Sequence, residues 1–285
     1  MRWALLFLMV VLLASPAHAS PKPYSAEAAA EMDAEEQRLE AEQHLQQQPP
    51  DLVEARRWLE SAAEQGSVEA MGAVGWLYEQ GLGVEPDAAR AMQYYTRAFD
   101  AGENEYGLRI GWMYIQGVGV EPDRAAGEEW FLRVIEERDD SAGRLALASL
   151  MVSDAMTNLR PERGAQARDL LVQALEDGLV EAAPFLAQMY MQGVGNLTAD
   201  PMQAVHYARI GADAGHARMQ AWMALLHARG ELVQLDLIEA HKWAVLAASG
   251  GSPAGEQLRH ELAARLDEAD LIESRRRALQ WITED

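Results

Sequence analysis

The 285-residue sequence contains no cysteine. A chain without cysteine can form neither a disulfide framework nor a zinc–thiolate site, and it has no thiolate nucleophile. Its stability must therefore come from packing and hydrogen bonding alone, and the chain is long enough to bury an adequate core.

Positive charge is also scarce. Lys and Arg number 24 against 45 Asp and Glu, which gives a formal net charge of −21 at pH 7. Such a field repels the phosphate backbone of nucleic acids and the surface of anionic membranes, so neither is expected as a partner. Two interpretations of the acidity stay open: it keeps the protein soluble, or it attracts a basic partner.

A short apolar run stands at the start of the sequence. Arg2 precedes an uninterrupted apolar stretch from Trp3 to Leu13, and an Ala-x-Ala sequence ends at Ala19. This order is typical of a secretory signal peptide. We therefore expect a signal peptide over residues 1–19, a periplasmic or secreted mature chain, and no membrane insertion after cleavage, because the run is short for a membrane span. An uncleaved anchor is the alternative.

Patterns for catalysis and metal binding are incomplete. The Gly-x-Gly of Gly81 to Gly83 lacks the third Gly and the Lys of phosphate-binding loops. His260 and Glu261 begin the His-Glu-x-x-His pattern of zinc proteases, but Ala264 stands where the second His is needed. The sequence therefore predicts no catalytic residue, no metal site and no cofactor, and the chain is not expected to be an enzyme.

An internal repeat organises the chain. The stretch from Gly75 to Asp87 returns 36 positions later as Gly111 to Asp123, and both copies read Gly-Trp-x-Tyr-x-Gln-Gly-x-Gly-Val-Glu-Pro-Asp. A fixed period of this length indicates one supersecondary unit stacked on copies of itself. The first Gly suits close approach of a second helix, the next Gly suits a left-handed helix end, and the Asp suits the start of another helix. Each unit is therefore predicted to be an antiparallel helix pair.

The second helix of the unit has its own signature, in which Ala, an aromatic residue and Gly follow the Asp after four, seven and fifteen positions. We place the starts of six copies, with the fourth degenerate, at Asp51, Asp87, Asp123, Arg163, Asp200 and Asp236.

These residues resemble the Sel-one-like repeat family, which is related to the tetratricopeptide repeats. The resemblance covers about residues 51–251 and is most specific in the two copies quoted above. Ala187 and Ala224 depart from it by replacing the packing Gly, and His227 replaces the Tyr. The resemblance implies an all-α fold, an α/α solenoid, and for most members a scaffold or adaptor role.

Four regions follow from this pattern. Residues 1–19 are the expected signal peptide, and 20–50 are a linker with an N-terminal capping helix over residues 26–47. Residues 51–251 hold about five to six helix pairs, of which the pair at 141–178 is degenerate. Residues 252–285 are expected to form C-terminal capping helices, with Leu271, Ile272, Leu279 and Trp281 closing the open end of the last repeat.

A binding groove is predicted by analogy with tetratricopeptide geometry, in which one face of the first helices lines the concave side. The aromatic and basic residues on that face are typical of binding anchors. They are Trp76, Arg109, Trp112, Phe185 and Trp222. The alternative for Trp76 and Trp112 is that they only pack between adjacent helices.

The expected function is binding of a protein partner of unknown identity by an exported scaffold or regulatory adaptor. Glycan binding by the aromatic face is one alternative. A β-lactam-hydrolysing enzyme is another, since certain Sel-one-like proteins are linked to that activity, but those are rich in paired cysteines and this chain has none.

Overall fold

The computed structural model describes residues 21–157 and 159–284, and the expected signal peptide lies outside them. The fold is all-helical, as predicted: in these residues the backbone forms helices and connections without a strand. Contacts divide the chain after Asp140 into two compact units, which are described separately.

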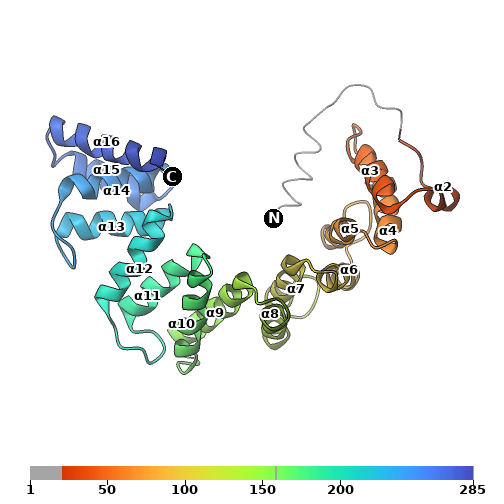
Figure 1. Ribbon diagram of the computed structural model, residues 1–285, viewed down its shortest axis with the longest axis horizontal. Coiled ribbons are helices and arrows are strands. Elements are labelled where there is room, and N and C mark those ends of the chain that lie inside the picture. Colours follow the sequence, from red (N-terminus) through yellow and green to blue (C-terminus); the bar gives the residue numbers. More distant parts are fainter. Residues whose placement is uncertain (1–20, 158, 285) are drawn as a thin grey trace. The chain divides into compact units, whose positions relative to one another are not determined.

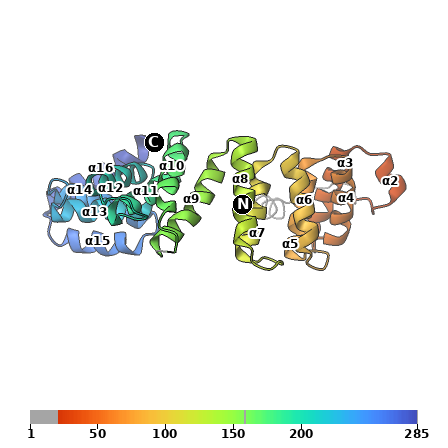
Figure 2. The same cartoon turned by 90° about the horizontal axis from the view of Figure 1, so that it is seen from below.

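The first unit consists of helices that pack in consecutive pairs, α3 on α4, α5 on α6 and α7 on α8. In Figure 2 the axes of α5 to α8 run side by side, and Figure 1 shows the same helices nearly end-on. The helices are α2 (Ala26–Ala30), α3 (Ala34–Leu45), α4 (Leu52–Glu64), α5 (Val68–Gln80), α6 (Ala88–Asp100), α7 (Asn104–Gln116) and α8 (Arg124–Arg138).

The second unit repeats this pairing with α9 on α10, α11 on α12 and α13 on α14, and both α15 and α16 pack on α14. Its elements are α9 (Ser141–Met156), α10 (Arg163–Glu176), the 3₁₀ turn η1 (Val180–Ala182), α11 (Ala183–Gln192), α12 (Pro201–Asp213), α13 (Ala217–Arg229), α14 (Leu237–Ser249), α15 (Pro253–Ala263) and α16 (Glu268–Glu284).

The loop inside each well-formed pair is fixed at both ends. The first helix ends at a left-handed glycine with φ between 66° and 68°, which a residue without a Cβ adopts most easily. The second helix begins at an aspartate whose carboxylate accepts a backbone N–H of the first turn, as Asp87 does from Arg90 at 2.9 Å. The N–H of the same Asp87 donates to the carbonyl of Tyr78 at 2.9 Å. The loop length is therefore set by hydrogen bonds at the cap.

Close helix approach inside the pairs explains the departures from the repeat pattern. A Cβ built on Gly75 would lie 2.5 Å from Cε1 of Tyr95, and one on Gly111 would overlap with Phe131. Where Ala187 and Ala224 replace these glycines, the corresponding residues of the second helices are also alanines, Ala208 and Ala244, and all four alanines are fully buried. In these four pairs a glycine thus faces a ring or an alanine faces an alanine.

The degenerate copy forms a helix pair without the glycine loop. At the end of α9, Asp154 is only 3% exposed and accepts from Nη1 of Arg163, the first residue of α10, at 2.8 Å. Its backbone carbonyl also accepts the N–H of Leu159 at 3.0 Å. An ion pair with hydrogen bonds therefore connects these two helices in place of the glycine turn.

The N-terminal region differs from the expected linker and single helix. Asp33 starts a new helix, α3, through a capping box with Glu36, so the expected helix is divided into α2 and α3. Before α2, the carbonyl of Lys22 accepts Nε1–H of Trp58 at 3.1 Å, and the Tyr24 ring contacts Trp58 edge-on at 5.2 Å. This segment therefore lies against α4.

The C-terminal helix α16 covers α14 with only some of the apolar residues expected to do so. Ala278 is buried, and the Trp281 ring lies 6.5 Å from that of Trp243. Ile272 and Leu279, expected to close the end, are 60% and 64% exposed. The helical spacing placed apolar residues on two faces of α16, and small residues such as Ala278 allow the closer approach to α14.

Replacing the packing glycine tests the close approach of the helices. We expect Gly111→Ala to lower the free energy of unfolding by about 1–3 kcal/mol, because the methyl group overpacks against Phe131. The double variant Gly111→Ala/Phe131→Ala recreates the alanine pairing of the later repeats and should cost less than the sum of the two single variants. Urea unfolding measures both, and additive costs would contradict this packing account.

The buried contact between α14 and α16 predicts a pH dependence of stability. His241 is 2% exposed and its Nδ1 lies 2.6 Å from Oγ of Ser274. Burial lowers the pKa of His241 below its usual value, and Arg275 and Arg259 lower this pKa further. The folded state thus favours the neutral ring of His241. The contribution of this ring to the free energy of unfolding is present above its unfolded pKa of about 6.5 and is lost as the pH falls below that value.

Wild type should therefore lose more unfolding free energy than His241→Gln between pH 7.5 and pH 5. Denaturant unfolding of both proteins at several pH values measures this difference. Parallel pH profiles would show that protonation of His241 is not coupled to folding.

Candidate functional site

In the first unit, the predicted face carries two tryptophans at the same place in successive repeats. Trp76 on α5 and Trp112 on α7 are both half-buried, whereas the core residue Trp58 is fully buried. Trp76 packs against the core of this unit, and the ring of Trp112 lies 5.2 Å from that of Phe131. Both indoles are therefore held by the scaffold and leave part of their surface open.

The third predicted residue of this unit, Arg109, is bound within the protein. Its guanidinium pairs with both carboxylate oxygens of Glu79, with 2.9 Å between Nε and Oε2. The Glu79 side chain is 1% exposed, and it also accepts a hydrogen bond from the Tyr95 hydroxyl at 2.9 Å. Burial lowers the pKa of Arg109 and raises that of Tyr95. Arg109 thus links α7 to α5 and compensates a buried carboxylate.

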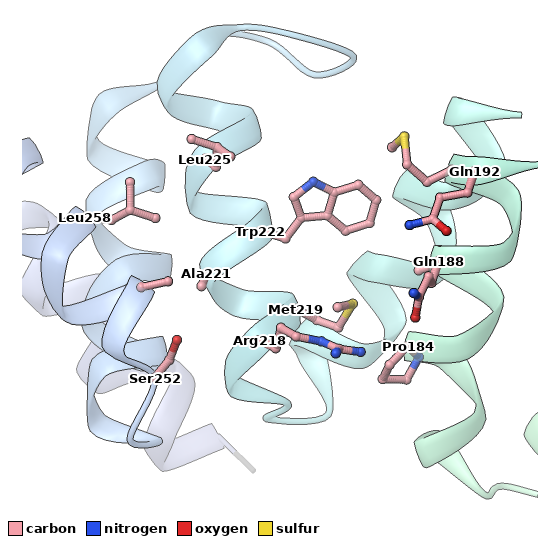
Figure 3. Close-up of a pocket in the computed structure, with 13 residues that line it drawn as sticks. Pro184, Gln188, Gln192, Arg218, Met219, Ala221, Trp222, Leu225, Ser252 and Leu258 are labelled. Atoms are coloured by element: carbon pink, nitrogen blue, oxygen red, sulfur yellow. The ribbon is translucent and has the colours of Figure 1, made fainter. Parts of the chain in front are cut away.

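In the second unit, a groove lies across α11, α13 and α15 (Figure 3). Its volume is about 410 Å³, which is within the range of about 300–1,000 Å³ typical of ligand pockets. Most of its lining is apolar. The lining residues are Pro184, Ala187, Gln188, Met191, Gln192, Arg218, Met219, Ala221, Trp222, Leu225, Ser252, Ala254 and Leu258.

Trp222 has a central place in this groove. Figure 3 shows its indole projecting from α13 toward Gln188 and Gln192 of α11. The ring is half-buried, so one part packs on the scaffold while another part faces the groove. The other predicted residue of this unit, Phe185, is half-buried on α11 but does not line the groove. The structure therefore brings Trp222 and the two glutamines together, without Phe185.

The charge of the groove is opposite to that of the whole chain. Its single charged lining residue is Arg218, and its lining contains no carboxylate although Asp and Glu number 45 in the sequence. Two amide side chains, the Ser252 hydroxyl and the indole N–H of Trp222 supply the other polar groups of the lining side chains. Hydrophobic contact, neutral hydrogen bonds and one positive charge are thus available to a ligand.

Sequence reasoning missed the contribution of α15, which it assigned to a cap. Leu258, Ala254 and Ser252 form one side of the groove. The signal was present in the spacing, since α15 begins at Pro253, 36 positions after Ala217 begins α13. Ser252 also caps its helix as Ser67 caps α5. This helix therefore occupies the place of a further first helix.

Two other kinds of site were sought in residues 21–157 and 159–284. Within these ranges no group of three or more His, Cys, Asp or Glu side chains is arranged to hold a metal ion. The same residues include no helix with the length and apolar character needed to cross a membrane.

Comparison with known proteins agrees with the helix-pair architecture. The chain is similar to a Sel1 repeat protein from Oxalobacter formigenes, with a TM-score of 0.58 and 24% identity over 73% of this chain and 86% of that one. It also matches a protective antigen of uropathogenic Escherichia coli strains that displays an SLR fold, with a TM-score of 0.46 and 19% identity over 90% of this chain and 62% of that one. No curated protein matches significantly in sequence.

The family model of the Sel1 repeat matches five segments, none of which includes α9 or α10. They are residues 42–67, 68–103, 107–137, 180–216 and 217–252. The first match begins within α3, so α3 and α4 form a repeat in which α3 is the first helix. Together the matches cover more than half of the sequence. The chain therefore belongs to the Sel1 repeat family, whose members generally mediate protein–protein interactions.

Proposed function

We propose that this protein is an exported scaffold or adaptor that binds a protein partner through the faces of its first helices, with the groove across α11, α13 and α15 as the main contact. The observation that carries the proposal is the character of this groove. It presents a half-buried Trp222 and an apolar lining free of carboxylates on an otherwise acidic protein. Aromatic residues supported by their neighbours are typical anchors at protein interfaces.

The size of the groove favours a segment over a whole domain. A volume of about 410 Å³ accommodates a few side chains. The amides of Gln188 and Gln192 lie one helical turn apart and can bond to the backbone of an extended chain. Trp76 and Trp112 give the first unit a half-buried aromatic face of its own.

Export is the second part of the proposal, and its support is the sequence pattern that ends at Ala19. We expect the protein isolated from the envelope or medium of its host to begin at Ser20, because the Ala-x-Ala sequence is a substrate for signal peptidase. N-terminal mass spectrometry measures this directly. A chain that retains its first residues in the cell interior would contradict export.

Site-specific photocrosslinking tests partner binding in the groove. With a photoreactive amino acid at Gln192 in the groove, we expect one defined protein of the host envelope to be crosslinked. The same amino acid at the exposed Gln203 of α12 is the control and should not capture it. Trp222→Ala should reduce capture at Gln192 at least fivefold, because it removes the central hydrophobic contact.

The matched control is Tyr207→Ala, which removes another half-buried aromatic residue, this one on α12. It should leave capture unchanged, and thermal unfolding followed by circular dichroism checks that both variants are folded. Equal capture at both positions, or capture that survives Trp222→Ala, would contradict the groove as the binding surface. Crosslinks to polysaccharide alone would favour glycan binding instead.

A further inference from the structure

Arg218 distinguishes the groove from the corresponding faces of the other repeats. It stands six positions before the packing residue of its first helix, Ala224. At the same position three other repeats carry an exposed glutamate, and these residues are Glu69, Glu105 and Glu181. The sign of the charge at this place is therefore reversed only in the helix that forms the centre of the groove.

The guanidinium of Arg218 is also unneutralised. Nearby arginines have carboxylate partners, since Arg209 pairs with Asp213 at 3.4 Å and Arg229 pairs with Glu231 at 3.9 Å. In the part of the chain that the structure describes, Arg218 has neither an ion pair nor a side-chain hydrogen bond. Figure 3 shows it extended along the groove toward Pro184 and Gln188. The exposed Arg218 side chain thus brings a positive charge to an apolar groove and has no carboxylate partner among the described residues.

We propose that the groove binds a peptide segment in which a large apolar side chain lies two residues from a carboxylate. The apolar side chain packs on Trp222, and the carboxylate pairs with Arg218. This inference rests on the proposed function and specifies the chemistry of the partner. The carboxylate can accept two parallel N–H bonds from the planar guanidinium of Arg218, which fixes the orientation of the two groups.

The spacing follows from helix and strand geometry. Arg218 and Trp222 are four positions apart on α13, so their Cβ atoms are about 5–6 Å apart. Side chains two residues apart in an extended peptide point to the same side and are separated by about 6–7 Å. The segment therefore reads apolar-x-acidic, and the carboxylate is that of an Asp or Glu side chain.

Defined peptides test this chemistry. The probes are fluorescein-labelled eight-residue peptides of Gly and Ser that contain Leu-x-Asp or the matched Leu-x-Asn. A second pair has Leu two positions before a C-terminal Gly that ends as a free acid or as an amide. Binding to the mature chain is measured by fluorescence polarisation. The Leu-x-Asp peptide should bind about fivefold more tightly than Leu-x-Asn, as expected for an exposed ion pair of about 1 kcal/mol.

Arg218→Gln should abolish this preference, and Arg209→Gln, the matched charge removal on α12, should preserve it. A preference confined to the C-terminal pair would assign the carboxylate to a chain end and overturn the inference of an Asp or Glu side chain. Equal affinities within both pairs, a preference that survives Arg218→Gln, or no binding by any peptide would overturn the inference. The proposed function would survive these outcomes if photocrosslinking at Gln192 still depended on Trp222, so the two failures are distinguishable.

Discussion

The close approach of the two helices inside each repeat is the constraint on which the rest of the structure depends. In α5–α6 and α7–α8 a glycine of the first helix faces a ring of the second, as at Gly111 and Phe131, and in α11–α12 and α13–α14 both positions are alanine. Either combination allows the helices to pack without a cavity. Because the packing residue fixes which face is buried, it also fixes which residues of the first helix face outward. The positions of Trp112 and Trp222 follow from this choice.

The outward face of the first helices differs between the two units, because the aromatic residue stands about one helical turn earlier relative to the packing residue in the second unit. Trp112 follows its packing residue, Gly111, by one position, and its ring contacts Phe131. Trp222 precedes its packing residue, Ala224, by two positions and extends toward α11. In the first unit, Arg109 neutralises the buried Glu79, and this ion pair joins successive repeats. In the second unit Arg218 has no such internal partner. One repeat architecture therefore provides a neutralised face and a positively charged groove.

Much of the fold could be predicted from the sequence, because the repeat is fixed by local chemistry. The backbone at helix ends requires a capping aspartate and a left-handed glycine, and these residues recur every 36 positions. Their recurrence indicated the helix pairs and the family. The groove was only partly predictable. Trp222 was found from its place on the first helix, but the α15 wall was missed, since Ser252 and Leu258 lie beyond the last Asp–Gly signature. The pairing of Arg109 with Glu79 depends on side-chain packing between repeats, which periodicity does not describe.

Binding in the groove is tested by hydrogen–deuterium exchange of the protein, alone and in complex with the protein that crosslinks at Gln192. Amide exchange in α11, α13 and α15 should be slower in the complex, because a segment bound there restricts opening of the helices that line the groove. Exchange in α12 should change little. Protection confined to α12 and α14, or confined to the first unit, would contradict the claim that this groove is the main binding surface.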